Sequence, residues 1–114
     1  MKIEEIRNAF FIRSSNRIKA HCLKRMAERE ITRKDISNCI MHGEIIEDYP
    51  LDADNTSETS YPSCLFLWVD IADSGAIHVV VGYNGHRIII ISAYKPDEDR
   101  WEKDLKQERR PNNV

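Results

Sequence analysis

The stretch that decides the fold is residues 76–94, AIHVVVGYNGHRIIIISAY. Two runs rich in β-branched side chains, Ile77–Val81 and Ile88–Ile91, flank the dipeptide Asn84-Gly85. Asn-Gly is typical of a two-residue type I′ turn between antiparallel strands, so the stretch predicts a β-hairpin. Four consecutive isoleucines are typical of a strand buried on both faces, so we expect the second strand in the interior of the sheet.

The turn predicts which side chains of the hairpin share a face of the sheet. If Asn84 and Gly85 form the loop, the pairing that continues outward from them places His78 opposite Ile91. On this register Tyr94 lies on the opposite face of the sheet from His78. One β-bulge would reverse this assignment, because it inserts an extra residue into one strand.

Before the hairpin, three helices are expected. Apolar residues recur at helical spacing over 2–12 and 18–29. The third helix begins at a capping box formed by Thr32 and Asp35 and ends at Gly43. In the second helix the stripe predicted to face the core is Ala20, Leu23, Met26 and Ala27.

After Gly43 the sequence favours strands. Residues 44–49 and 63–70 are predicted as strands joined by the polar, acidic loop 51–62, and a last charged helix with Trp101 and Leu105 is expected within 97–114. The fold class predicted from this order is α+β, with N-terminal helices packed on one side of a four-stranded antiparallel sheet and a short C-terminal helix.

Composition indicates one globular domain. The chain has 114 residues, of which 41% are hydrophobic and 32% charged. We expect a single domain over 1–114, made of an N-terminal helix and linker (1–17), a core (18–96) and a C-terminal helix and tail (97–114).

No apolar run is long enough to span a bilayer and the first residues include acids, so the expectation is no membrane contact and a cytoplasmic location. The three cysteines lack C-x-x-C spacing, which favours reduced thiols.

The charges are strongly polarised although the net charge is only −2. Residues 13–34 hold eight bases and two acids, whereas residues 44–74 hold eight acids and no base. The two segments could face each other across the fold, or one could present a cationic surface to an anion such as RNA.

Five residues carry side chains that could take part in a chemical site. His21, Arg25 and Arg29 recur at i, i+4 and i+8 on the second helix, where guanidinium groups suit phosphate and an imidazole can move protons. His78 is a polar residue in an apolar strand, and Tyr94 carries a phenol at the end of the isoleucine strand. The simpler interpretations are a solvated basic helix, a hydrogen-bonded structural histidine and an aromatic residue at the core's rim. Neither metal nor cofactor is expected, because no metal-ligand, Walker or Rossmann motif occurs.

Four ordered blocks resemble a bacterial family of small proteins, domain-of-unknown-function family 4258. They are AHCLKRMAEREIT at 20–32, GEIIEDYP at 43–50, IHVVV at 77–81 and IISAYKP at 90–96. The second helix resembles the family's pattern His-Ala-x-x-Arg-Met-x-x-Arg-x-Ile-Ser. The chain departs from that family at Cys22 for alanine, Glu30 for glycine and Ser92 for threonine.

The resemblance implies a fold akin to the RelE and BrnT group of small ribonucleases. It further implies a toxin of a type II toxin–antitoxin system, acting as a metal-independent endoribonuclease and restrained by a protein antitoxin. The site residues that the resemblance carries onto this chain are His21, Arg25, Arg29, His78 and Tyr94. The alternative functions are a non-catalytic RNA- or protein-binding module and an accessory protein whose apolar sheet face forms a homodimer.

Overall fold

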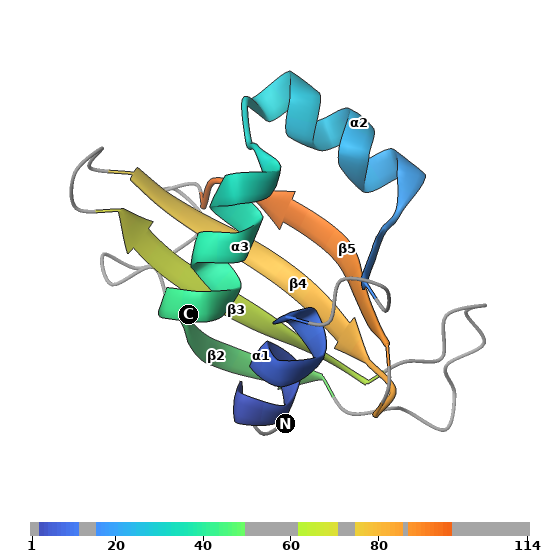
Figure 1. Ribbon diagram of the computed structural model, residues 1–114. Helices are drawn as coiled ribbons and strands as arrows, with labels where there is room; N and C mark the ends of the chain where they lie inside the picture. The colour runs from blue at the N-terminus through green and yellow to red at the C-terminus, as the bar shows by residue number, and fades with distance from the viewer. Residues whose placement is uncertain (1–2, 12–15, 50–61, 71–74, 86, 97–114) are drawn as a thin grey trace, which may run out of the picture.

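The structure is a computed structural model that describes residues 3–11, 16–49, 62–70, 75–85 and 87–96 (Figure 1). Its helices are α1 (Ile3–Phe11), α2 (Ala20–Arg29) and α3 (Arg33–His42). Its strands are β1 (Asn16–Ile18), β2 (Glu44–Tyr49), β3 (Ser63–Asp70), β4 (Gly75–Tyr83) and β5 (Ile88–Tyr94). The predicted C-terminal helix and most of the acidic loop lie outside the described residues.

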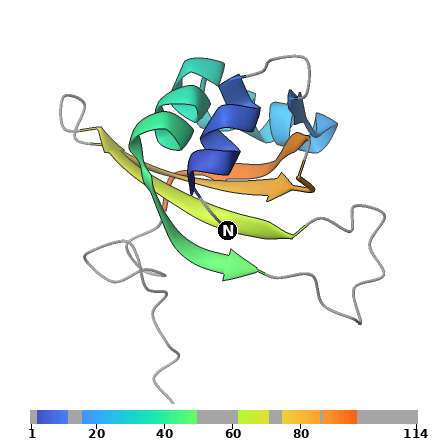
Figure 2. The same cartoon turned by 60° about the horizontal axis from the view of Figure 1, so that its bottom comes forward.

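The strands form one sheet in the order β1-β5-β4-β3-β2, and the three described helices cover one face of it (Figure 2). Strands β2 to β5 form the predicted antiparallel meander. The α+β class with helices on one side is therefore confirmed.

The sheet has five strands in the described residues, so the prediction of four is wrong. The added strand, β1, pairs parallel with β5 from Asn16↔Ile88 to Ile18↔Ile90, and the Lys19 amide donates to the Ile90 carbonyl at 3.2 Å. Three residues are too few to show a strand period, which is why the sequence pattern missed them. Because β1 occupies its outer edge, β5 is an interior strand there, as its four isoleucines predict.

The hairpin between β4 and β5 differs from the predicted register in two ways. Asn84 pairs with Arg87, its amide donating to the Arg87 carbonyl at 3.4 Å, so the turn lies one residue later than expected. A β-bulge then leaves Ile91 as an extra residue, because the pairs continue from Val81↔Ile90 to Val80↔Ser92. The later turn leaves each β5 side chain on the face predicted for it relative to β4. The bulge moves the side chains that follow it in β5 to the other face.

The core lies between the helices and the covered face of the sheet. Helix α3 buries Ile36, Cys39 and Ile40, as predicted. Helix α2 buries Met26, as predicted, together with Cys22, while Leu23 is 38% exposed, so the rest of the predicted stripe of α2 is wrong. The side chains that complete this core are Ile6, Ala9, Ile31, Cys64, Phe66, Ile77, Val79, Val81, Ile88, Ile90 and Ala93.

The ends of α3 are fixed by local hydrogen bonds. The predicted capping box is confirmed, since the Asp35 amide donates to Thr32 Oγ1 at 3.1 Å and the Thr32 amide donates to Asp35 Oδ2 at 2.9 Å. At the other end Arg7 donates from Nε to the Ile40 carbonyl at 2.8 Å and from Nη2 to the Gly43 carbonyl at 2.7 Å. Arg7 thus ties α1 to the junction of α3 and β2.

Gly43 ends α3 as predicted, but not through a left-handed backbone. Its φ is −82° and its ψ is −169°, an extended conformation. A Cβ at this position would lie 2.4 Å from both the Cys39 and the Leu67 carbonyl oxygens. The absence of a side chain therefore lets the α3–β2 junction pass close to β3.

The left-handed residue at a helix end is Glu30, which follows α2 with φ 58°. The Ile31 amide donates to the Met26 carbonyl at 2.9 Å, which is the bond expected of a Schellman motif. A side chain in this conformation costs about 1 kcal/mol relative to the right-handed region. Glu30 stands where the resembling family usually has glycine.

We expect Glu30→Gly to raise the free energy of unfolding by about 0.5–1 kcal/mol, because glycine adopts a positive φ without a steric cost. Chemical denaturation at constant pH measures the change. Glu30→Ala is the matched control, since it removes the same carboxylate but keeps a Cβ. Equal stability of the alanine and glycine variants would contradict the argument.

Candidate functional site

A direct contact between two predicted site residues joins His78 on β4 to Tyr94 on β5. The two residues are direct cross-strand partners. The Nδ1 atom of His78 lies 3.3 Å from the Tyr94 hydroxyl, and the rings meet edge to face with centroids 5.3 Å apart. His78 is completely buried, whereas Tyr94 is only half-buried.

This contact overturns the predicted facing of the two residues. The predicted register opposed His78 to Ile91 and put Tyr94 on the other face of the sheet. The bulge at Ile91 advances β5 by one residue against β4 and brings Tyr94 opposite His78. Because side chains alternate along a strand, this one-residue insertion alone moves Tyr94 to the face of His78.

The face that carries His78 is the one turned away from the helices. Its neighbour across β3 is Leu67, and Leu65 and Ile89 also lie on this face; all three are buried outside the helix-packed core. An imidazole in such apolar surroundings is stable when its polar atoms are hydrogen-bonded. The Tyr94 hydroxyl provides one such partner and links the buried ring to a half-exposed phenol.

Arg29 also lies at this end of β5. Its Nη1 atom donates to the Ala93 carbonyl at 2.8 Å, which is the peptide group that leads into Tyr94. Strand β1 pairs with β5 only as far as Ile90, so Arg29 binds the edge of β5 beyond that strand. The guanidinium therefore fixes the backbone that carries Tyr94 and joins α2 to the sheet.

His21 and Arg25 remain on the exposed surface of α2, apart from the His78–Tyr94 contact. Arg25 Nη1 lies 3.3 Å from Glu28 Oε2 in a surface ion pair, with the two side chains 59% and 48% exposed. A pair this exposed contributes little to stability. The structure thus brings together three of the five predicted site residues at one end of β5 and leaves two on the helix surface.

The geometry of α2 explains this division. Residues four apart on a helix differ by about 40° in direction, so an i, i+4, i+8 row drifts around the axis. Arg29 is turned by about 80° from His21 and approaches the direction of the buried Cys22, so it reaches the Ala93 carbonyl although its side chain is exposed like that of His21. The predicted row of three is exposed on α2, and its last member, Arg29, also bonds to the sheet.

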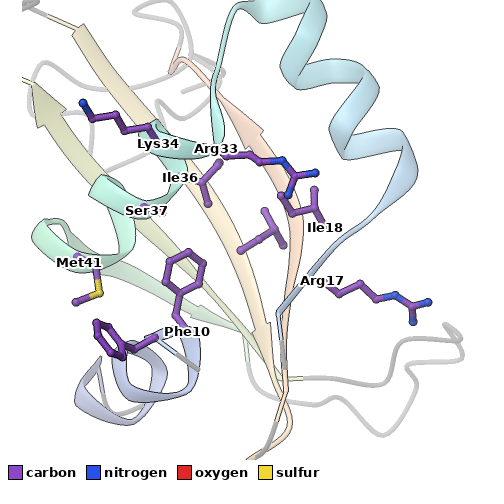
Figure 3. A pocket seen from close by; sticks show the side chains of 10 residues that line it. Phe10, Arg17, Ile18, Arg33, Lys34, Ile36, Ser37 and Met41 are labelled. Carbon is purple, nitrogen blue, oxygen red and sulfur yellow. The ribbon is translucent and has the colours of Figure 1, made fainter. Parts of the chain in front are cut away.

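A groove that the sequence did not predict lies between α1, α3 and β1 (Figure 3). Its volume is about 690 Å³. Its described lining consists of Phe10, Phe11, Arg17, Ile18, Arg33, Lys34, Ile36, Ser37, Met41 and Ile90. The three cations belong to the basic segment 13–34, which is the only sequence signal for the groove.

The three cysteines are buried thiols. Burial raises the pKa of Cys22, against the opposing effect of the Arg29 guanidinium, and burial raises the pKa of Cys39 far above its usual range. Burial, with a further contribution from the Asp48 carboxylate, raises the pKa of Cys64 from 9.0 to about 12. At neutral pH these thiols are protonated and poorly nucleophilic.

We expect stability to fall above pH 9, because the folded protein holds the Cys64 proton more firmly than the unfolded chain does. The contribution of this thiol is complete below pH 9 and is lost progressively toward about pH 12. In that range the Cys64 thiol lowers the free energy of unfolding by about 1.4 kcal/mol for each pH unit. Urea denaturation of wild type and Cys64→Ala across this range measures the difference, and parallel curves would contradict it.

In the part of the chain that the structure describes, no helix is long and apolar enough to cross a membrane. Within the same residues, no group of three or more histidine, cysteine, aspartate or glutamate side chains is arranged to hold a metal ion.

Comparison with known families gives one match. A family described as a domain of unknown function (DUF4258) matches residues 18–95, a range that contains all five predicted site residues. Comparisons with curated proteins and with solved structures give no significant match. Because the family match spans well over half of the chain and agrees with the four sequence blocks, this protein belongs to the DUF4258 family.

Proposed function

We propose that this protein is a metal-independent endoribonuclease, acting as the toxin of a type II toxin–antitoxin pair, and that Tyr94 is its reacting group. The observation that carries the proposal is the contact between the His78 Nδ1 atom and the Tyr94 hydroxyl at 3.3 Å. It couples a partly buried phenol, at which RNA would react, to a buried imidazole that can exchange a proton with it.

The chemistry follows from this pairing. Neutral His78 with an unprotonated Nδ1 accepts the Tyr94 proton as the phenol oxygen takes the proton of a ribose 2′-hydroxyl. The 2′-oxygen attacks the adjacent phosphorus, the bond to the 5′-oxygen breaks, and that oxygen takes a proton from water. The products are a 2′,3′-cyclic phosphate and a 5′-hydroxyl, and His78 returns its proton through Tyr94 to the hydroxide left when that water gave up its proton.

The basic residues serve two roles in this proposal. Arg29 positions Tyr94 through the Ala93 carbonyl. His21, Lys24 and Arg25 are exposed on α2, where they attract the phosphates of an RNA strand that reaches Tyr94. The exposed acids of β2, Glu44 and Asp48, form a surface on which a basic segment of an antitoxin would bind.

The direct test is cleavage of a single-stranded RNA by purified protein in the presence of EDTA. We expect fragments with 2′,3′-cyclic phosphate and 5′-hydroxyl ends from wild type, and none from an all-deoxy oligonucleotide of the same sequence. Induced expression should arrest growth and fragment total RNA. Cleavage of the deoxy strand, or cleavage that EDTA abolishes, would contradict the mechanism.

RNA binding without cleavage is a second candidate function, favoured by the complete burial of His78. A buried imidazole hydrogen-bonded to tyrosine also suits a purely structural role. This candidate predicts that wild type binds RNA, that His21→Ala/Arg25→Ala weakens the binding, and that neither protein cuts. The oligonucleotide assay separates the two functions when binding and cleavage are both measured.

A further inference from the structure

The groove between α1, α3 and β1 has the composition of a site for an amphiphilic anion (Figure 3). We propose that it binds a small molecule with an apolar chain and a single carboxylate head. The groove adjoins Ile90, on the helix-covered face of the sheet, whereas His78 and Tyr94 lie on the other face. This proposal is therefore independent of the proposed ribonuclease activity.

The walls of the groove are suited to an apolar chain. A volume of about 690 Å³ is within the range of small-molecule sites. Six of the ten described lining residues are apolar, and they come from α1, β1, α3 and β5. Phe11 is 78% exposed, and Met41 adds a flexible thioether that adapts to ligand shape. A chain lying here would cover apolar surface that now faces water.

The charges at the groove match one anionic head. The described lining contains three cations and no acid. In Figure 3, Arg33 extends from α3 toward Ile18 on β1, whereas Arg17 and Lys34 point away from the groove. One guanidinium over the groove offers a planar pair of donors, the geometry that binds a carboxylate through both of its oxygens.

The same lining disfavours a nucleotide. Reading a base requires hydrogen-bond donors and acceptors directed at its edge. Apart from the three cations, the only polar side chain in the described lining is that of Ser37. An aliphatic chain needs no such groups, so the apolar carboxylate fits the lining better.

The test is titration of the full-length protein, labelled at the methionine methyl groups, with sodium dodecanoate below its micelle concentration. We expect one molecule to bind and the Met41 methyl resonance to shift, while that of Met26, which α2 buries in the core, stays in place. Dodecanol should bind at least about tenfold more weakly, because it cannot form the charge-assisted bonds to Arg33. Adenosine monophosphate should bind more weakly than dodecanoate.

Two variants test where the carboxylate head and the apolar chain of the ligand bind. Arg33→Gln should weaken dodecanoate binding at least about tenfold and leave dodecanol binding unchanged. Ser37→Trp should block both ligands, since the indole would fill the groove. Arg87→Gln, which removes an exposed cation outside the described lining of the groove, is the matched control and should bind as wild type does. Wild-type affinity in Arg33→Gln, equal shifts of Met26 and Met41, tighter binding of the nucleotide, or no binding of dodecanoate would each overturn the proposal.

Discussion

Replacing Gly43 by alanine is expected to lower the free energy of unfolding by about 3 kcal/mol or more, at the upper end of the range for overpacking. The added Cβ would lie 2.4 Å from two backbone oxygens, those of Cys39 in α3 and Leu67 in β3. Neither can rotate away as a side chain does, so the junction must move. Movement would also disturb the Arg7 bond to the Gly43 carbonyl. Thermal and urea denaturation measure the loss, about 10 °C in melting temperature for a domain of this size.

Gly85→Ala is the comparison that isolates the steric cause. Gly85 has φ +97°, a conformation that strains alanine, but apart from its chain neighbours no atom of the described residues lies within 4 Å of the position its Cβ would take. This variant should lose only about 1 kcal/mol, the cost of the left-handed backbone. A loss at Gly43 no larger than that at Gly85 would show that the α3–β2 junction relaxes freely.

The sequence predicted those parts of the fold that depend on local patterns. The capping box of Thr32 and Asp35, the buried stripe of α3 and the interior position of the isoleucine strand are each determined by neighbours within a few residues. Strand β1 was missed because its three residues show no period and gain their hydrogen bonds from a strand about seventy residues later. Its formation depends on tertiary pairing.

The candidate site was predicted residue by residue but not in its geometry. The resemblance named His78 and Tyr94, while the Asn-Gly turn placed them on opposite faces. The extra residue Ile91 sits in a uniform run of four isoleucines, so no change in side-chain character marks the bulge. The α2 row did not predict the bond from Arg29 to the Ala93 carbonyl, because a drift of about 40° per step turns Arg29 away from His21 and toward β5.

Tyr94→Phe is expected to reduce RNA cleavage by about 10²–10⁴-fold, the range typical of losing a general acid or base. Phenylalanine keeps the ring and its edge-to-face packing on His78 and removes only the hydroxyl near Nδ1. The stability of the variant should change by no more than about 1.5 kcal/mol, the range of one hydrogen bond. Cleavage rates and urea denaturation on the same preparations separate the two effects.

The matched control is Tyr49→Phe, which removes the hydroxyl of a 40% exposed tyrosine that bonds to Glu47 on β2. It should cleave RNA at the wild-type rate, and unchanged cleavage by Tyr94→Phe would exclude Tyr94 as the reacting group.

The two residues should act as one unit. His78→Asn, whose amide can occupy the place of Nδ1, should slow cleavage strongly in the wild-type background, because the phenol loses its proton acceptor. In the Tyr94→Phe background the same change should have almost no further effect, since His78 reaches RNA only through the Tyr94 hydroxyl. Multiplicative losses in the double variant would mean that His78 supports the fold independently of the reaction, and the proton path from Tyr94 to the buried imidazole would be wrong.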